Sequence, residues 1–71
     1  MNHGIITRYF EGEGKDFGYI KDITGENFFF HISDFCAAVR PESWMKVKFE
    51  SVPDGRRKKH DKAVNIVPED W

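Results

Sequence analysis

The stretch that decides the fold is KDFGYIKDITGENFFFHISDF, residues 15–35, which holds five of the seven phenylalanines in the chain. It predicts a β-hairpin with arms at residues 15–22 and 26–33. The intervening Ile23-Thr24-Gly25 suits a three-residue hairpin loop. The last residue of such a loop takes a positive φ, which glycine adopts without steric cost.

This loop fixes the register of the predicted hairpin. If Asp22 lies opposite Glu26, then Tyr19 lies opposite Phe29, and side chains alternate between the two faces along each arm. An apolar face then collects Gly18, Ile20, Phe28, Phe30 and Ile32. The opposite face is both aromatic and basic, with Lys15, Phe17, Tyr19, Lys21, Phe29 and His31.

Length and composition limit the possible classes of protein. The 71 residues suffice for one small domain, residues 1–71. No apolar run approaches the roughly 18 residues of a membrane span, the N-terminal MNHG lacks the features of a signal peptide, and the single Cys36 forms no internal disulfide. We therefore expect a cytoplasmic protein without a membrane partner.

Charge is balanced overall but uneven locally. The net charge of −1 is unlike that of a strongly basic nucleic-acid binder. However, residues 56–60 read RRKKH and Lys62 extends this basic block. A polyanion would therefore meet a local patch, in which Arg56 and Lys58 are candidate phosphate contacts.

The remaining chain predicts three further strands and almost no helix. Strands are expected at residues 4–10, 45–52 and 63–67, and a short helical turn at residues 36–38, capped by Ser33 or Asp34. Five short strands in a chain of this length favour a five-stranded antiparallel OB-fold barrel, because closure removes exposed sheet edges. The fold class is therefore all-β.

The parity of the first strand stays open. Strict alternation places Ile6, Arg8 and Phe10 on one face, whereas a β-bulge would mix the two faces. The residue that joins the aromatic face from this strand is therefore Arg8, Tyr9 or Phe10.

The aromatic and basic face predicts a binding site for single-stranded RNA or DNA. Burying each ring would stabilise the fold by roughly 1.5–3 kcal/mol, so leaving several on the surface needs a reason. A nucleic-acid base stacked on an aromatic ring contributes about 1–3 kcal/mol with little dependence on base identity. Phe17, Tyr19, Phe29 and His31 are the predicted stacking residues, and Lys15, Lys21, Arg56 and Lys58 the predicted phosphate contacts.

Other chemistries find little support in the sequence. Around Lys15 the pattern of a phosphate-binding loop fails, since Tyr9 stands at its first glycine and Asp16 at its Ser/Thr position. The histidines and Cys36 lack metal-ligand spacing, and no nucleophile, base and orienting acid cluster together. We expect no enzyme activity and no cofactor. The alternative is a protein-interaction or dimerisation module that uses the same aromatic face. The expected oligomeric state is a monomer or a weak or swapped dimer.

Two motifs resemble those of cold-shock domains. Residues 15–20, KDFGYI, are similar to the first ribonucleoprotein motif of that family, and residues 27–33, NFFFHIS, to the second. Residues 63–66, AVNI, resemble its final strand, so the similarity covers nearly the whole chain in order. Asp16 departs from the usual glycine of the first motif.

This resemblance implies an OB-fold barrel that binds single-stranded RNA or DNA with low sequence specificity. It places the stacking residues at Phe17, Tyr19, Phe29 and His31, and a basic residue at Lys15. It further implies a role as an RNA chaperone or as a regulator of transcription or translation.

Overall fold

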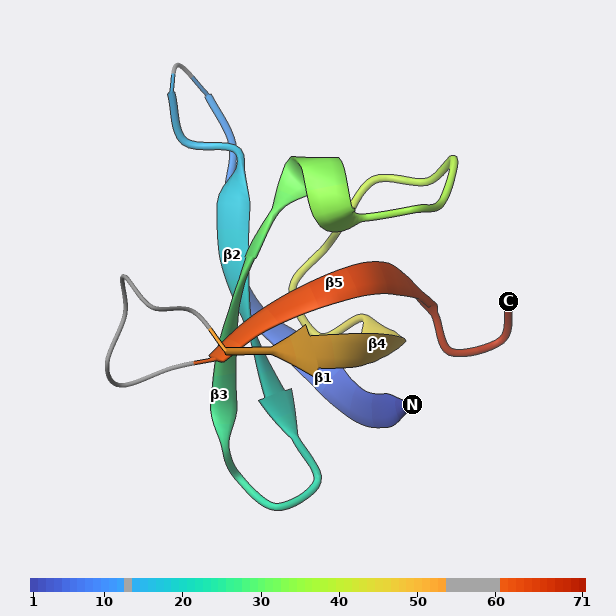
Figure 1. Cartoon of the computed structure of the whole chain (residues 1–71). Helices are drawn as coiled ribbons and strands as arrows, with labels where there is room; N and C mark the ends of the chain where they lie inside the picture. Colours follow the sequence, from blue (N-terminus) through green and yellow to red (C-terminus); the bar gives the residue numbers. More distant parts are fainter. Residues whose placement is uncertain (13, 54–60) are drawn as a thin grey trace.

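The computed structural model describes residues 1–12, 14–53 and 61–71, whose strands close into a small β-barrel (Figure 1). The order of the strands around the barrel is β1-β2-β3-β5-β4, and β4 pairs with β1 to complete the ring. The elements are β1 (Asn2–Phe10), β2 (Phe17–Asp22), β3 (Asn27–His31), the 3₁₀-helix η1 (Ile32–Asp34), β4 (Lys46–Val52) and β5 (Asp61–Pro68).

The predicted all-β, five-stranded barrel is confirmed, and its size and strand order are those of an OB-like barrel. The expectation that every pair is antiparallel is wrong at one junction, because β3 and β5 run parallel. The reason is geometric. Directions cannot alternate all the way around a closed ring with an odd number of strands, so at least one neighbouring pair must be parallel.

The β2–β3 hairpin has the predicted register. Phe17 pairs with His31, Tyr19 with Phe29 and Ile20 with Phe28. Gly25 closes the loop at a φ of +89°, and its N–H donates a hydrogen bond of 3.0 Å to the carbonyl oxygen of Asp22. The loop therefore sets the pairing that divides the aromatic residues between the two faces.

The inner faces of all five strands supply the core. Phe28 of β3 and Phe49 of β4 pack with ring centroids 5.0 Å apart, although their strands are not neighbours in the barrel. Val47 and Phe49 of β4 point inward. The buried residues are Ile6, Ile20, Phe28, Phe30, Phe35, Val47, Phe49, Ala63 and Ile66.

A β-bulge in β1 settles the parity that the sequence left open. Ile6 pairs with Ile20, but the next paired residue is Arg8, opposite Tyr19, so Thr7 is the extra residue. The Thr7 hydroxyl donates a hydrogen bond of 3.3 Å to the carbonyl oxygen of Tyr19. Because the bulge reverses the alternation, Arg8 returns to the outer face together with Tyr19.

Beyond the bulge, Tyr9 points inward and Phe10 outward. Tyr9 lies opposite Gly18 and stacks on the core residue Phe30, with ring centroids 6.1 Å apart and planes 11° from parallel. Burial is the main cause that raises the pKa of the Tyr9 hydroxyl, and the Asp16 carboxylate adds to it. Phe10 lies opposite Phe17 on the outside of the barrel.

The segment after β3 differs from expectation. The helical turn is η1, at Ile32–Asp34, rather than at residues 36–38, and its N-cap is His31 rather than Ser33 or Asp34. The His31 ring accepts a hydrogen bond from the backbone N–H of Ser33. The turn forms early because β3 must leave the barrel wall before Phe35 re-enters the core and bridges to Ile66 of β5.

Candidate nucleic-acid interface

Cross-strand pairing arranges the outer face of β1, β2, β3 and β5 in rows. One row runs from β1 to β3 through Phe10, Phe17 and His31. The neighbouring row runs from β1 to β5 through Arg8, Tyr19, Phe29 and Lys62. Since residues paired across strands project to the same side, both rows lie on one continuous surface.

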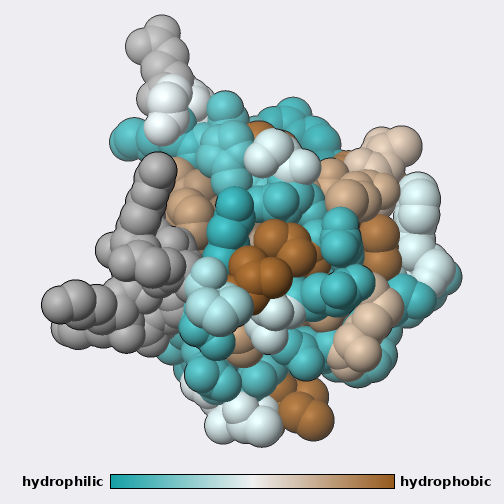
Figure 2. All heavy atoms as spheres, in the orientation of Figure 1, coloured by the Kyte–Doolittle hydropathy of each residue, from teal (hydrophilic) through white to brown (hydrophobic). Residues whose placement is uncertain are grey.

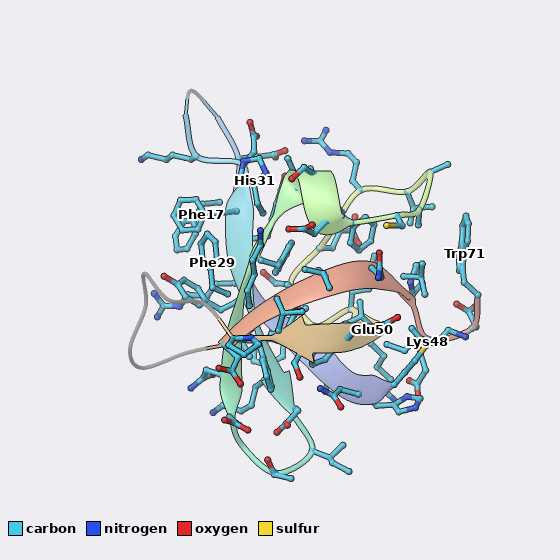
Figure 3. The ribbon with its side chains drawn as sticks, viewed as in Figure 1. Phe17, Phe29, His31, Lys48, Glu50 and Trp71 are labelled. Atoms are coloured by element: carbon cyan, nitrogen blue, oxygen red, sulfur yellow. The ribbon has the colours of Figure 1, made fainter. Side chains whose placement is uncertain are left out.

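Four rings of these rows form one cluster, which we call the aromatic platform: Phe10, Phe17, Tyr19 and Phe29. Phe17 is its centre, with ring centroids 5.1 Å from Phe10, 5.7 Å from Phe29 and 6.2 Å from Tyr19. Tyr19 and Phe29 meet edge to face at 5.9 Å. All four side chains are half-buried, and Figure 3 shows Phe17 and Phe29 projecting to the same side of the hairpin.

His31 continues the platform at the end of β3 and is exposed. Its Nδ1 accepts a hydrogen bond of 3.1 Å from the Ser33 backbone N–H and lies 3.0 Å from the Ser33 hydroxyl. A nitrogen that accepts a backbone N–H carries no proton, so in the neutral ring the proton is on Nε2. The imidazole therefore presents a donor edge beside Phe17, held in place by η1.

Cations surround the platform at three places. Lys21 is exposed in the next row, opposite Asn27. Lys15 is exposed in the turn before β2, because the strand begins at Phe17 and not at residue 15 as predicted. Arg8 is exposed beside Tyr19. The other two predicted phosphate contacts, Arg56 and Lys58, lie outside the described residues.

Acidic groups near the platform partly offset these cations. Asp16 is exposed next to Phe17. Glu11 pairs with Arg40, and both side chains are largely exposed. Asp34 of η1 pairs with Lys62 across the β3–β5 seam, with 3.2 Å between Oδ2 and Nζ. The local charge is therefore mixed. Among the described residues around the platform, Arg8, Lys15 and Lys21 are the cations exposed to solvent.

The structure brings together the predicted residues Phe17, Tyr19, Lys21, Phe29 and His31, with Lys15 in the adjacent turn. Sequence reasoning left Arg8, Tyr9 and Phe10 open as the residue that joins this surface, and the structure places Arg8 and Phe10 there. Sequence reasoning did not assign Lys62 to this surface. A single β-bulge before Arg8 turns both Arg8 and Phe10 outward, and the sequence left room for such a bulge. Lys62 could not be assigned, because its place beside Phe29 depends on a parallel pairing of strands more than thirty positions apart.

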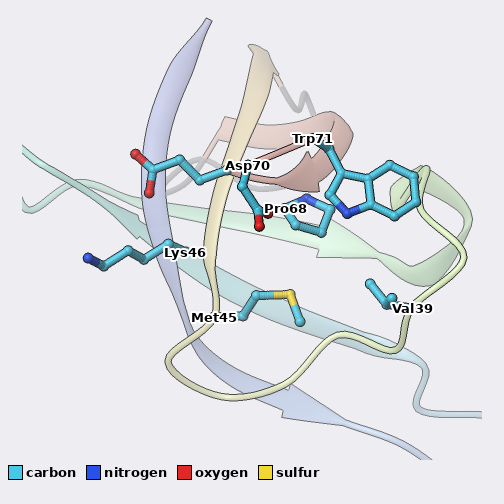
Figure 4. Close-up of a pocket in the computed structure, with 7 residues that line it drawn as sticks. Val39, Met45, Lys46, Pro68, Asp70 and Trp71 are labelled. Atoms are coloured by element: carbon cyan, nitrogen blue, oxygen red, sulfur yellow. The ribbon is translucent and has the colours of Figure 1, made fainter.

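A second surface feature lies away from the platform. A groove of about 640 Å³ is open to solvent and is lined by Val39, Met45, Lys46, Pro68, Glu69, Asp70 and Trp71 (Figure 4). Figure 3 places Trp71 far across the barrel from Phe17 and Phe29. On the face seen in Figure 2, hydrophilic residues predominate and hydrophobic ones form small separate areas.

The part of the chain that the structure describes holds neither a metal site nor a helix that could span a membrane. Within residues 1–12, 14–53 and 61–71, no three His, Cys, Asp or Glu side chains come close enough to hold a metal ion. In the same residues no helix has the length and apolar character needed to cross a bilayer. The two rows on the outer face combine aromatic and cationic groups on one surface.

Two comparisons with known proteins gave no match for this chain. No protein-family model matches the chain, and no curated protein matches it significantly. The structure therefore defines the class of protein, which is a small OB-like barrel with an aromatic platform on its outer face.

Proposed function

We propose that this protein binds single-stranded RNA or DNA with low sequence specificity. One observation carries the proposal: four contacting rings and an imidazole share the outer face of β1–β3, with Arg8, Lys15 and Lys21 exposed around them. Rings offer faces on which unpaired bases stack, and interspersed cations meet the phosphates between those bases. A sheet surface of this kind reads splayed bases, so a duplex competes poorly.

The expected affinity is modest. Three or four stacked bases contribute roughly 3–10 kcal/mol before the cost of ordering the strand is subtracted. The net charge of −1 adds no long-range attraction. A dissociation constant in the micromolar range, about −8 kcal/mol, is consistent with these opposing contributions.

The resemblance of residues 15–20 and 27–33 to the two motifs of cold-shock domains supports the same proposal. On that basis the protein acts in the cytoplasm as an RNA chaperone, or as a regulator of transcription or translation. Holding strands unpaired is the physical step common to these roles.

A titration of fluorescein-labelled oligo-dT and oligo-U, followed by fluorescence anisotropy, tests the proposal. Phe29→Ala removes a ring that contacts both Phe17 and Tyr19, and we expect its affinity to fall about 5- to 150-fold, the equivalent of 1–3 kcal/mol. Trp71→Ala is the matched control, because it removes an aromatic ring far from the platform and should leave binding unchanged. Thermal unfolding of each variant verifies that the barrel is intact.

Salt dependence separates this function from the alternative, a protein-interaction or dimerisation module on the same face. Phosphate contacts release counterions, so oligonucleotide affinity must fall as salt rises. Docking of an apolar partner or of a second copy is insensitive to salt. Wild-type protein that binds neither oligonucleotide, or a Phe29→Ala variant with unchanged affinity, would reject the proposed function.

A further inference from the structure

Lys62 occupies a position at the edge of the platform that suits a phosphate. It lies on β5 directly beside Phe29, in the row that also contains Tyr19 and Arg8. Two rings are thus flanked by a cation at each end of the row. A strand that stacks its bases on the rings would bring its phosphates to these two ends.

In the free protein, Lys62 is already paired with a carboxylate. Its Nζ lies 3.2 Å from Oδ2 of Asp34, and the two side chains are 36% and 22% exposed. That oxygen is inaccessible to solvent and accepts no hydrogen bond in the part of the chain that the structure describes. The contact is therefore an ion pair without hydrogen-bonding geometry, and Lys62 is the cation that balances this oxygen.

The position of Asp34 follows from the local fold. η1 begins directly after His31, which lies beside the platform and caps the helix. The helix carries Asp34 back over the β3–β5 seam. The carboxylate thus lies close to the platform in the chain, yet faces Lys62 instead of solvent.

We propose that Asp34 holds the place of a nucleic-acid phosphate on Lys62, so that binding exchanges one anion for the other. This inference rests on the proposed function and adds to it an internal competitor for the phosphate site. When a phosphodiester takes Lys62, the Asp34 carboxylate loses its counter-charge and must draw a cation from solution. That uptake cancels the cation released from the phosphate, so Lys62 contributes nothing net to the salt dependence of binding.

The test is a double-mutant cycle with Asp34→Asn and Lys62→Met, measured by anisotropy with oligo-dT at several salt concentrations. Asparagine keeps the shape of the side chain without its charge, and methionine keeps most of the lysine stem. We expect Asp34→Asn to bind about fivefold more tightly, the upper range for a partly exposed ion pair. Its plot of log K against log salt should be steeper by about 0.7, the contribution of one phosphate contact on a single strand.

The double variant distinguishes exchange from simple repulsion. We expect both the tighter binding and the steeper slope to disappear when Lys62→Met is combined with Asp34→Asn, so that the double variant binds as Lys62→Met alone does. If Asp34→Asn binds as the wild type does, or if its gain persists without Lys62, the exchange is rejected. Unfolding curves of the three variants show whether each keeps the fold. If a variant with Asp34→Asn does not fold, the salt dependence of Lys62→Met is the test. An unchanged slope of log K against log salt then supports exchange, and a shallower slope rejects it.

These outcomes are separate from failure of the proposed function. Wild-type protein that binds no oligonucleotide rejects both ideas. Wild-type protein that binds through Phe29 but shows no coupling between positions 34 and 62 rejects the exchange alone.

Discussion

Replacing Gly18 by alanine should damage both the barrel and the platform. Gly18 lies between Phe17 and Tyr19 on β2, opposite Tyr9 of the bulged β1. A Cβ at this position would lie 2.4 Å from the Arg8 carbonyl oxygen and 2.7 Å from the Phe30 ring. Ordinary contact begins at 3.4 Å, so the oxygen must move by about 1 Å.

The cost follows from what has to move. The Arg8 oxygen is backbone, and the Phe30 ring is fully buried and stacked against Tyr9, so neither neighbour has a flexible end that can swing away. Overpacking of a tight core costs 1–3 kcal/mol, and we expect about 2–3 kcal/mol here. A domain of this size has roughly 3–5 kcal/mol in total, so the melting temperature should fall by roughly 10–20 °C.

Urea denaturation followed by circular dichroism measures this loss, with Gly25→Ala as the matched control. Gly25 has a φ of +89° and nothing within 4 Å of its missing Cβ, so alanine there meets strain without a clash. We expect the control to lose about 1 kcal/mol. Gly18→Ala should also bind oligonucleotide more weakly, because β1 carries Arg8 and Phe10. A Gly18→Ala protein as stable as the wild type, or more stable than Gly25→Ala, would refute the close-approach argument.

Two further predictions concern local features of the barrel. The Asp22 carboxylate accepts hydrogen bonds from the Thr24 hydroxyl and from the backbone N–H groups of Thr24 and Glu26, which hold its pKa below the usual value. The stabilisation that these hydrogen bonds give the ionised Asp22 is present above about pH 4 and is lost as the pH falls through the lowered folded-state pKa. In urea denaturation between pH 6 and 2, the free energy of unfolding should therefore depend less on pH in Asp22→Ala than in the wild type. Trp44 has a φ of +72° and is 74% exposed, so Trp44→Gly should raise the free energy of unfolding by about 0.5–1 kcal/mol, whereas Trp44→Ala, which keeps the strained backbone, should bring no gain.

The hairpin is the part of the fold that could be predicted from local sequence. Its loop, its register and the division of its rings between two faces were all predicted, because period-2 alternation and a glycine at positive φ act over a few neighbouring residues. The position of η1 was not predicted. The cap that forms it is a histidine side chain, which only becomes available once β3 has ended at His31.

Within the chain, therefore, residues 15–35 by themselves determined a two-faced aromatic hairpin and hence most of the candidate site. Tertiary structure decided what borders it. Arg8 and Phe10 face outward because β1 bulges at Thr7 where it pairs with β2, and this pairing joins two different strands. Lys62 meets Asp34 because an odd-stranded barrel closes through a parallel pair. Both features depend on contacts between residues that are far apart in the sequence. These contacts stabilise the protein only when the barrel is closed.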